Sequence, residues 1–364
     1  MRIGIVTPYD LADEGGVKRH VLHLAEGLRR SGDEVTVLGP LRSGARVEGV
    51  CGFGGVVDVP ANGASNRLAL FTPPWTLRRF FDAHPFDVVH VHEPYVPLLT
   101  YYAMWMTPAA AHVATFHMYA EDESPVLGYV RRGLARAVGR IDRGIAVSPP
   151  AAAFASRRWT GPLTVIPNGV PTAVFHPSPR PSDANGAATR LLFVGNWRDD
   201  RKGLPLLLEA HRRLRKEGVP VTLDVVGAGP AAAPAVDGVT FHGVVSVEED
   251  LAEHYRACDV FVSPATGRES FGIVVLEAMS VGCPVVCSDI AGYREVVARE
   301  GARLVPPASV EALTDALRAL AATPSAERRR MGAINRRRAE EFDWEVLTQR
   351  VRQEYEAAMA ARRG

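Results

Sequence analysis

Short apolar runs and amphipathic segments alternate along almost the whole chain. Residues 3–6 are apolar throughout, and residues 17–30 then carry Val21, Leu24 and Leu28 at helical spacing. A short continuous apolar run is typical of a strand that is buried on both faces, whereas apolar positions three or four residues apart predict a helix. Because this alternation continues to the end of the chain, the sequence predicts the α/β class.

Two successive series of strands are expected. The first series lies at 3–6, 34–38, 88–92, 113–116 and 144–147, followed by a strand that ends in a turn within 163–169. The second series lies at 190–194, 222–226, 239–241, 260–262, 284–287 and 302–305. Residues 171–188 lie between them, and their Pro, Ser, Asn, Ala and Gly without periodicity are typical of a linker. We therefore expect two doubly wound domains, 1–170 and 171–343, with ligands bound at the carboxyl ends of the strands in a shared cleft.

Composition and charge narrow the class of protein. The chain has 364 residues, of which 47% are hydrophobic and 23% charged, as in an ordinary soluble protein with room for two domains. A net charge of +1 gives no field that would attract nucleic acid. The four cysteines form no CxxC pair, which favours free thiols in a reducing cytoplasm. The first residues resemble a strand instead of a signal peptide, and no run reaches the ~18 apolar residues of a membrane span.

The segment 267–277 carries the most specific pattern. Glu269 and Glu277 are eight positions apart around an expected helix start, with Ser270 as the N-cap. The amides of the first turn are those of Phe271, Gly272 and Ile273. Such amides attract phosphate, and a carboxylate beside a phosphate needs a partner of its own, for which a sugar or ribose hydroxyl is suitable. The segment favours a nucleotide joined to a sugar, against the alternative of an ordinary capped helix.

Two loops that follow first strands of the domains also suit a phosphate ligand. Gly15 and Gly16 precede the first helix and allow close approach of a ligand to the backbone, although a plain tight turn explains them equally well. Lys202 lies in the loop 195–203, where an ammonium is a natural diphosphate partner and a charged surface loop is the alternative. The loop lacks the spacing of a P-loop.

Histidines gather at two neighbouring strand ends. His117 follows one strand, and His90 and His92 end another. A strand-end histidine is more often structural than functional. A metal site is discounted, because no further Cys, Asp or Glu stands at a metal-ligand spacing.

Two other patterns support rival classes only weakly. The segment 227–232 matches the dinucleotide fingerprint of a nicotinamide oxidoreductase, but it contains a proline and lies deep in the chain. The arginine triplets 328–330 and 336–338 could bind phosphate backbones, yet neighbouring acids favour a solvated helix face.

Taken together, these residues resemble the retaining GT-B glycosyltransferases of family 4, and among them the bacterial phosphatidylinositol mannosyltransferases. The resemblance covers nearly the whole chain. It is carried by the segments 1–9, 15–20, 91–94, 114–117, 166–169 and 201–203, and most specifically by the spaced pair Glu269 and Glu277. It implies an N-terminal acceptor-binding domain, a C-terminal donor-binding domain, and a final helix in 344–364 that returns to the N-terminal domain.

The resemblance also implies roles for individual residues. The catalytic residues would be His117 near the reacting sugar, Glu269 on its hydroxyls and Lys202 on the diphosphate. The donor site would comprise Gly16, Arg201, Phe271, Gly272, Ile273 and Glu277, with Glu277 on the ribose. One departure affects the diphosphate clamp, because Asn196 stands where many relatives have an arginine, so that Arg198 or Arg201 would have to replace it.

On the acceptor side, the resemblance points to Tyr9 and to a loop that would grip an inositol phosphate. The acceptor-binding residues are Tyr9, Asn62, Ser65 and Arg67. In the segment 75–81, Arg78 and Arg79 lie beside large apolar side chains, and such a helix suits an anionic membrane surface or, alternatively, ordinary packing on the sheet.

The implied reaction moves a hexose, with mannose from GDP-mannose favoured, to a lipid or glycan hydroxyl such as that of phosphatidylinositol. Retention would proceed by front-face departure without an enzymic nucleophile. No Asp-x-Asp motif is present, so neither a metal nor a cofactor is expected to be required, although a divalent ion is compatible with the site. The alternatives are a UDP-sugar-dependent transferase for a polysaccharide or small molecule, and a catalytically silent nucleotide-sugar binding protein. The expected location is cytoplasmic, at the inner face of the cell membrane.

Overall fold

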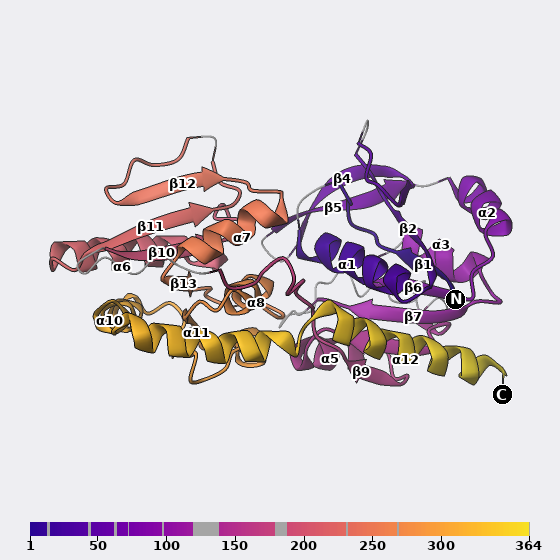
Figure 1. Cartoon of the computed structure of the whole chain (residues 1–364). Helices are drawn as coiled ribbons and strands as arrows, with labels where there is room; N and C mark the ends of the chain where they lie inside the picture. The colour runs from indigo at the N-terminus through magenta and orange to yellow at the C-terminus, as the bar shows by residue number, and fades with distance from the viewer. Residues whose placement is uncertain are drawn as a thin grey trace. The chain divides into compact units, whose positions relative to one another are not determined.

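Two compact units divide the chain in the computed structural model (Figure 1). Unit 1 comprises Met1–Gly169 with Trp344–Gly364, and unit 2 comprises Val170–Asp343. The boundary lies one residue before the expected one. The structure describes residues 1–12, 15–42, 45–61, 64–71, 73–96, 98–118, 138–178, 188–230, 232–267 and 269–363.

Unit 1 is built on a parallel sheet with the strand order β3-β2-β1-β6-β7-β8-β9. Its strands are β1 (Arg2–Val6), β2 (Glu34–Gly39), β3 (Val50–Gly52), β6 (Val88–His92), β7 (Ala111–Phe116), β8 (Arg143–Ala146) and β9 (Leu163–Val165). The central strands are buried on both faces, which explains their continuous apolar sequences. The order reverses between β1 and β6, and this is the position where an open α/β sheet binds its ligand.

Helices cover both faces of this sheet (Figure 1). They are α1 (Gly16–Arg30), α2 (Pro74–Ala83), α3 (Leu99–Met106), α5 (Pro149–Ser156) and α12 (Trp344–Arg363). On one face, α1 and α12 pack Leu24 and Tyr355 against Ile3 and Ile5 of β1. On the other face, α2 and α3 contribute apolar side chains to a second cluster. The last helix therefore belongs to the N-terminal unit, although it is separated from it in sequence by all of unit 2.

Unit 2 repeats the architecture with the strand order β12-β11-β10-β13-β14-β15. Its strands are β10 (Thr189–Val194), β11 (Val221–Val226), β12 (Val239–Gly243), β13 (Val260–Ser263), β14 (Val285–Ser288) and β15 (Ala302–Val305). The helical segments are η1 (Asp200–Lys202), α6 (Leu204–Lys216), α7 (Glu248–Ala257), α8 (Ile273–Ser280), α9 (Ala291–Arg294), α10 (Val310–Ala322) and α11 (Ser325–Glu340). Here the strand order reverses between β10 and β13.

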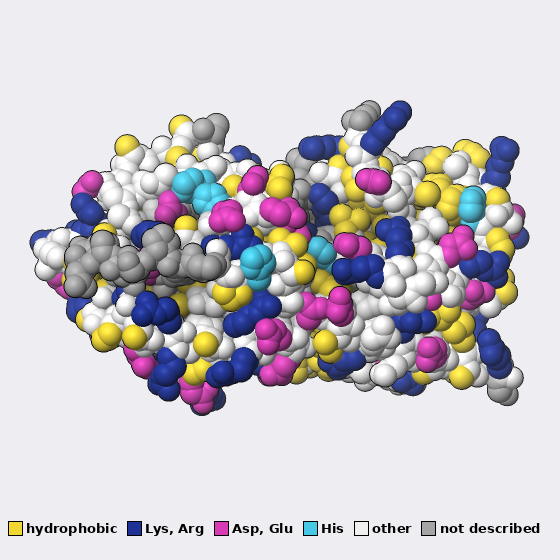
Figure 2. Space-filling model, in the orientation of Figure 1, with side chains coloured by type: hydrophobic (Ala, Val, Ile, Leu, Met, Phe, Trp, Pro, Cys, Tyr) yellow, Lys and Arg dark blue, Asp and Glu magenta, His cyan; other side chains and the backbone are white. Residues whose placement is uncertain are grey.

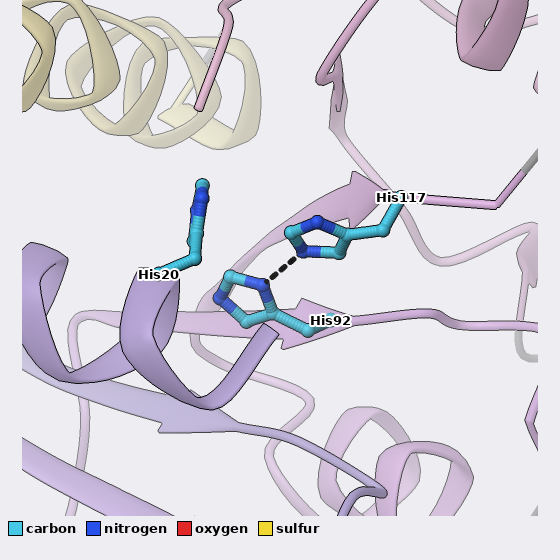
Figure 3. A group of neighbouring side chains, drawn as sticks. All are labelled: His20, His92 and His117. Carbon is cyan, nitrogen blue, oxygen red and sulfur yellow. Dashed lines mark hydrogen bonds between the residues drawn. The ribbon is translucent and has the colours of Figure 1, made fainter. Parts of the chain in front are cut away.

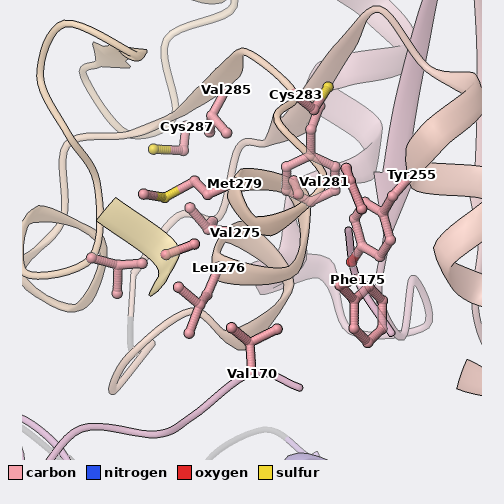
Figure 4. Packing of buried hydrophobic residues seen from close by; sticks show 14 of the residues in the cluster. Val170, Phe175, Tyr255, Val275, Leu276, Met279, Val281, Cys283, Val285 and Cys287 are labelled. Carbon is pink, nitrogen blue, oxygen red and sulfur yellow. The ribbon is translucent and has the colours of Figure 1, made fainter. Parts of the chain in front are cut away.

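The helix α8 lies within the larger apolar cluster of unit 2. Val275, Leu276 and Met279 of this helix are fully buried beside Tyr255 of α7 and Val285 of β14 (Figure 4). Since α8 has apolar residues all around, it is held from several sides, and its amino end has a fixed position in the unit.

The segment predicted as a linker is packed where the structure describes it, and that prediction is wrong for its first residues. Phe175 is fully buried in the core of unit 2, and Val170 N donates to Phe342 O at 3.0 Å. On the unit 1 side of the junction, a Cβ atom on Gly169 would lie 2.7 Å from the ring of Trp344. The remainder of the predicted linker, 179–187, lies outside the described residues.

Three strands were missed by the sequence reasoning: β3, and the strands β4 (Gly55–Ala61) and β5 (Ala64–Phe71) of an antiparallel hairpin. None of the helices in the described residues combines the length and apolar character that crossing a membrane requires. Basic and acidic side chains are interspersed over the face shown in Figure 2, in keeping with the net charge of +1.

Candidate active site

The loop after β10 and the loop after β13 are joined by tight backbone packing. Gly203 has a φ of 76°, and a Cβ atom there would lie 2.0 Å from the carbonyl oxygen of Pro264. Next to this contact, Thr266 N donates to Arg201 O at 2.8 Å. Only glycine fits such an approach, so Gly203 allows the two loops to meet at the switch point of the sheet.

This packing brings Lys202 and Glu269 together. Lys202 Nζ lies 2.6 Å from Glu269 Oε1, and the two side chains are 28% and 17% exposed. The residues are 67 positions apart in sequence, and each had been singled out independently. An ammonium has three N–H donors, and one of them is directed to Glu269, so the pair presents both a cation and a carboxylate at one point.

The start of α8 differs from the prediction in its cap. The N-cap position is Gly272, in the left-handed conformation with a φ of 100°, and not Ser270; no side chain caps the helix. A Cβ atom on Gly272 would lie 2.6 Å from Tyr293, which explains why glycine occupies this position. With no side-chain cap, the first-turn amide of Ile273 has no partner within its own helix. The side chain of Phe271 is a buried core residue, so only its backbone is available to a ligand.

Glu277 lies in the middle of α8 and is 2% exposed. Its Oε2 accepts a hydrogen bond from Tyr255 OH at 2.7 Å. A buried carboxylate needs donors, and the tyrosine supplies one of them. Tyr255 is a residue of the site region that the sequence reasoning did not identify, because nothing local to α7 distinguishes it from a core tyrosine.

Arg201 and Arg198, either of which was expected to replace the arginine that many relatives have at position 196, bind other groups of unit 2. Arg201 forms a two-pronged ion pair with Asp199, with Nε 2.9 Å from Oδ1. Arg198 Nε donates to Gly229 O at 2.6 Å. Both guanidinium groups therefore stabilise the loops that follow β10 and β11. Lys202 is the cation that contacts Glu269.

In unit 1, His117 follows β7 and His92 ends β6, next to the switch point. His92 Nδ1 and His117 Nε2 are 2.9 Å apart and share a hydrogen bond. His90 uses both ring nitrogens, with Nδ1 at 2.7 Å from Tyr355 OH and Nε2 at 2.7 Å from Thr115 Oγ1. Burial lowers the pKa of His92 and of His117 well below the usual value, so both rings are neutral at pH 7.

Glu93 holds the backbone at the carboxyl ends of β6 and β7, which we call the histidine corner because His92 and His117 lie there. Its Oε1 accepts from the amides of His117 and Met118, both at 2.6 Å. Glu93 is fully buried and has a φ of 52°, which is uncommon for a residue with a side chain. Burial raises the pKa of its carboxyl to about 7, against the opposing effect of the two amides.

His20 is the residue of this corner that the sequence reasoning did not select. It comes from the first turns of α1, and its ring contacts those of His92 and His117 at centroid distances of 5.3 and 4.8 Å. Its Nδ1 lies 2.8 Å from Asn168 Oδ1. The available signal was its helical spacing of four residues from Gly16, which begins α1 one residue before the predicted start.

The predicted acceptor residues are placed only in part. Tyr9 is half-buried after β1, and burial together with Glu93 raises its pKa well above the usual value. Ser65 and Arg67 belong to strand β5, where they pair with Pro60 and Asp58, and so the predicted loop is a hairpin strand at these positions. Asn62 lies outside the described residues.

The rival patterns have structural explanations. A Cβ atom on Gly227 would lie 2.0 Å from Gly195 O, so this glycine serves close packing of two loops. Arg336 of α11 donates to the carbonyls of Thr172, Phe175 and Ser280, and thus joins α11 to the first residues of unit 2 and to the end of α8. Residue 231 of the dinucleotide pattern lies outside the described residues.

Comparison with known proteins identifies the class. The family model "Glycosyltransferase Family 4" matches residues 14–174, and "Glycosyl transferases group 1" matches residues 188–323. The solved sucrose-phosphate synthase of Thermosynechococcus elongatus superposes with a TM-score of 0.76 at 22% identity, covering 99% of this chain and 100% of that one. Anabaena HepE, solved with UDP and glucose, superposes with a TM-score of 0.74 at 18% identity, covering 97% and 98%. These findings define a glycosyltransferase with the GT-B fold and confirm the predicted class.

Curated relatives extend over nearly the full length. The chain is 34% identical to the phosphatidyl-myo-inositol mannosyltransferase of Mycobacterium leprae, over 98% of this chain and 96% of the relative. It is 33% identical to the protein of the same name from Propionibacterium freudenreichii, over 96% and 93%. The chain belongs to glycosyltransferase family 4, together with these relatives.

Proposed function

We propose that this glycosyltransferase moves mannose from GDP-mannose to the inositol ring of phosphatidylinositol, with retention of configuration at the sugar. The single observation that carries the proposal is the Lys202–Glu269 pair beside the uncapped start of α8. The names of the full-length relatives support the choice of mannose and phosphatidylinositol.

Unit 2 supplies the donor contacts in this proposal. The ammonium of Lys202 takes the charge of the diphosphate, and the amides of Phe271, Gly272 and Ile273 add backbone donors. Glu269 accepts from hydroxyls of the sugar, and Glu277 from the ribose. Gly16 in unit 1 allows the phosphates to approach the backbone. Arg201 reaches the donor only if it leaves Asp199, so its part is smaller than that of Lys202.

The reaction needs no nucleophile from the protein. The bond between the sugar C1 and the diphosphate oxygen breaks, the inositol hydroxyl oxygen attacks C1 from the same face, and the departing phosphate oxygen accepts the hydroxyl proton. The protein orients the two substrates and stabilises the negative charge that develops on the diphosphate. His117, held neutral by burial, is a hydrogen-bonding group for the sugar rather than a charge.

The lipid acceptor gives α2 a membrane-facing role. Trp75 is 72% exposed, and Arg78 and Arg79 are exposed three and four residues further along the same helix. On the opposite side Leu77 and Phe81 are buried in unit 1. An exposed tryptophan with two arginines suits an anionic bilayer, to which each basic residue adds about 1 kcal/mol. The acceptor contacts of Tyr9, Asn62, Ser65 and Arg67 belong to the same proposal.

The test is a donor panel with vesicles that contain phosphatidylinositol. The full chain is incubated with GDP-mannose or UDP-glucose, and the lipid products are measured by mass spectrometry. We expect a mass increase of one hexose with GDP-mannose that disappears in Lys202→Met. Transfer from UDP-glucose instead would establish the UDP-sugar alternative, and acceptor-independent binding without product would establish the silent binding protein. Trp75→Ala with Arg79→Ala should lower sedimentation with anionic vesicles and leave neutral vesicles unaffected.

A further inference from the structure

Three histidine rings converge at the carboxyl edge of the unit 1 sheet (Figure 3). His20 comes from α1, His92 from the end of β6 and His117 from the residue after β7. They are 5%, 0% and 8% exposed. One ring nitrogen from each lies within 4.8 Å of the corresponding nitrogens of the other two.

The hydrogen-bonding pattern leaves nitrogen lone pairs in this cluster. The Oδ1 atom of Asn168 can only accept, so His20 Nδ1 carries the hydrogen and the lone pair is on Nε2. His92 and His117 share one hydrogen between them. The remaining nitrogen of His92, Nε2, is buried and has no hydrogen-bond partner within the described residues. When Nε2 carries the hydrogen of His92, the lone pair of Nδ1 faces that of His117 Nε2, and an ion bound by both would replace the hydrogen bond between them.

We propose that His20, His92 and His117 form a binding site for a divalent transition-metal ion of the Zn²⁺ or Co²⁺ type. Three imidazole nitrogens and one open position are a common ligand set for zinc. Ligands about 2.0–2.1 Å from a tetrahedral ion are about 3.3 Å apart, so the His92–His117 pair at 2.9 Å is already close to this spacing. His20 closes the site by a small movement of its ring.

The surroundings fit a metal site in two further respects. Asn168 accepts from the nitrogen of His20 that faces away from the proposed ion, which fixes the ring orientation as partners of metal-bound histidines do. The carboxyl group of Glu93 borders the cluster through its bonds to the amides of His117 and Met118. A buried dication needs a neighbouring acidic group, and Glu93 supplies one.

The ion competes with sugar transfer, and this part of the inference rests on the proposed function. A metal on His117 changes the charge and the orientation of the ring that the donor sugar would otherwise meet. Transition-metal ions therefore inhibit transfer reversibly, and a chelator restores it. The site is an inhibitory one and carries no step of the reaction.

The binding test uses Co²⁺ alone with the full chain, followed by the visible absorption of tetrahedral cobalt. We expect one equivalent to bind without a sulfur-to-cobalt charge-transfer band. His20→Asn should weaken binding at least 10-fold, and Asn168→Ala by a smaller factor. The matched control is His242→Ala, because His242 lies 2.6 Å from Asp224 and next to His254 on the surface of unit 2. Binding that depends on His242 and not on His20 would overturn the proposal.

Inhibition is then measured for each protein relative to its own metal-free rate. Wild type should lose most of its transfer activity at one equivalent of Zn²⁺ and recover with EDTA, and His20→Asn should need at least 10-fold more Zn²⁺. Equal sensitivity of the two proteins would overturn the inhibitory role. Thermal unfolding confirms that the variants are folded. If no transfer is found with any donor, the proposed function fails, and the cobalt titration still decides the metal site.

Discussion

Removal of the Lys202 ammonium is the most direct test of the donor site. Lys202→Met keeps most of the apolar stem and removes the charge. Two unit charges 4 Å apart interact by about 4 kcal/mol at an effective dielectric constant of about 20, which is appropriate for a side chain that is 28% exposed. Part of this energy is already present with the bound donor, so we expect about 3 kcal/mol to be lost from the transition state. This loss corresponds to a decrease in kcat of about 10²-fold.

The partner residue makes the prediction sharper. Glu269→Gln keeps the shape of the side chain and removes its charge, and we expect a loss of several kcal/mol in kcat/KM because the bonds to sugar hydroxyls weaken. Since Lys202 and Glu269 are in direct contact, the double variant should lose less than the sum of the two single variants. A strictly additive result would mean that the two residues act independently.

Stability measurements separate the catalytic effect from a folding defect. Exposed or partly exposed ion pairs contribute about 0–1 kcal/mol, so neither variant should unfold much earlier than wild type. Arg190→Met is the matched control, because Arg190 pairs with Asp259 at the amino ends of β10 and β13, at the opposite edge of the same sheet. The assay is release of nucleoside diphosphate in the presence of acceptor. Near-normal turnover in both Lys202→Met and Glu269→Gln would refute the assignment of the donor site.

Three further predictions concern the folding of each unit. Gly203→Ala should destabilise unit 2 by several kcal/mol in urea unfolding because its Cβ would meet Pro264 O at 2.0 Å, whereas Gly218→Ala, at a φ of 79° in open space, should cost about 1–2 kcal/mol; equal losses would contradict the packing argument. Tyr255→Phe should cost about 1–3 kcal/mol because it removes a donor from buried Glu277, and an unchanged melting temperature would argue against that bond. Burial lowers the pKa of His112 to about 4, and the nearby charge of Arg362 adds to this effect. The ring is therefore protonated at a lower pH in the folded state than in the unfolded state. The free energy of unfolding of unit 1 should therefore be unaffected by His112 above pH 6.5 and should fall by about 3 kcal/mol as the pH falls to 4. His112→Gln should make the free energy of unfolding depend less on pH.

The sequence predicted most of the two sheets, because their central strands are short apolar runs bounded by turns. The edges of most strands differ by one or two residues from the expected ones, whereas β6 has the predicted bounds of 88–92. The hairpin β4–β5 was missed because its two strands, where the structure describes them, pair with each other outside the main sheets, and residues 62–67 were interpreted as a loop. The start of the predicted linker was wrong because its polar composition concealed Phe175, a single apolar residue that is enough to fasten the segment to a core.

The helix cap at α8 shows a limit of local reasoning. Ser270 is a good N-cap residue in isolation, yet Gly272 takes the position because Tyr293, twenty-one residues further along, leaves space for nothing larger. A cap preference of about 1 kcal/mol cannot compete with such a steric contact. The expected amides of Phe271, Gly272 and Ile273 nevertheless remain at the helix start, since the shift moves the cap by two residues only.

The Lys202–Glu269 pair of unit 2 and the histidine cluster of unit 1 differ in how much of them a sequence can reveal, and the reason is topological. Lys202 and Glu269 follow strands β10 and β13, which are neighbours at the point where the strand order reverses, so their contact follows from the topology of the sheet. The histidine corner also lies at such a reversal, and its two strand-end histidines were identified. His20, however, comes from a helix and is oriented by Asn168, which is 148 residues away. Strand order brings strand ends together by a general rule, whereas a helix side chain reaches the site only through the particular packing of its unit.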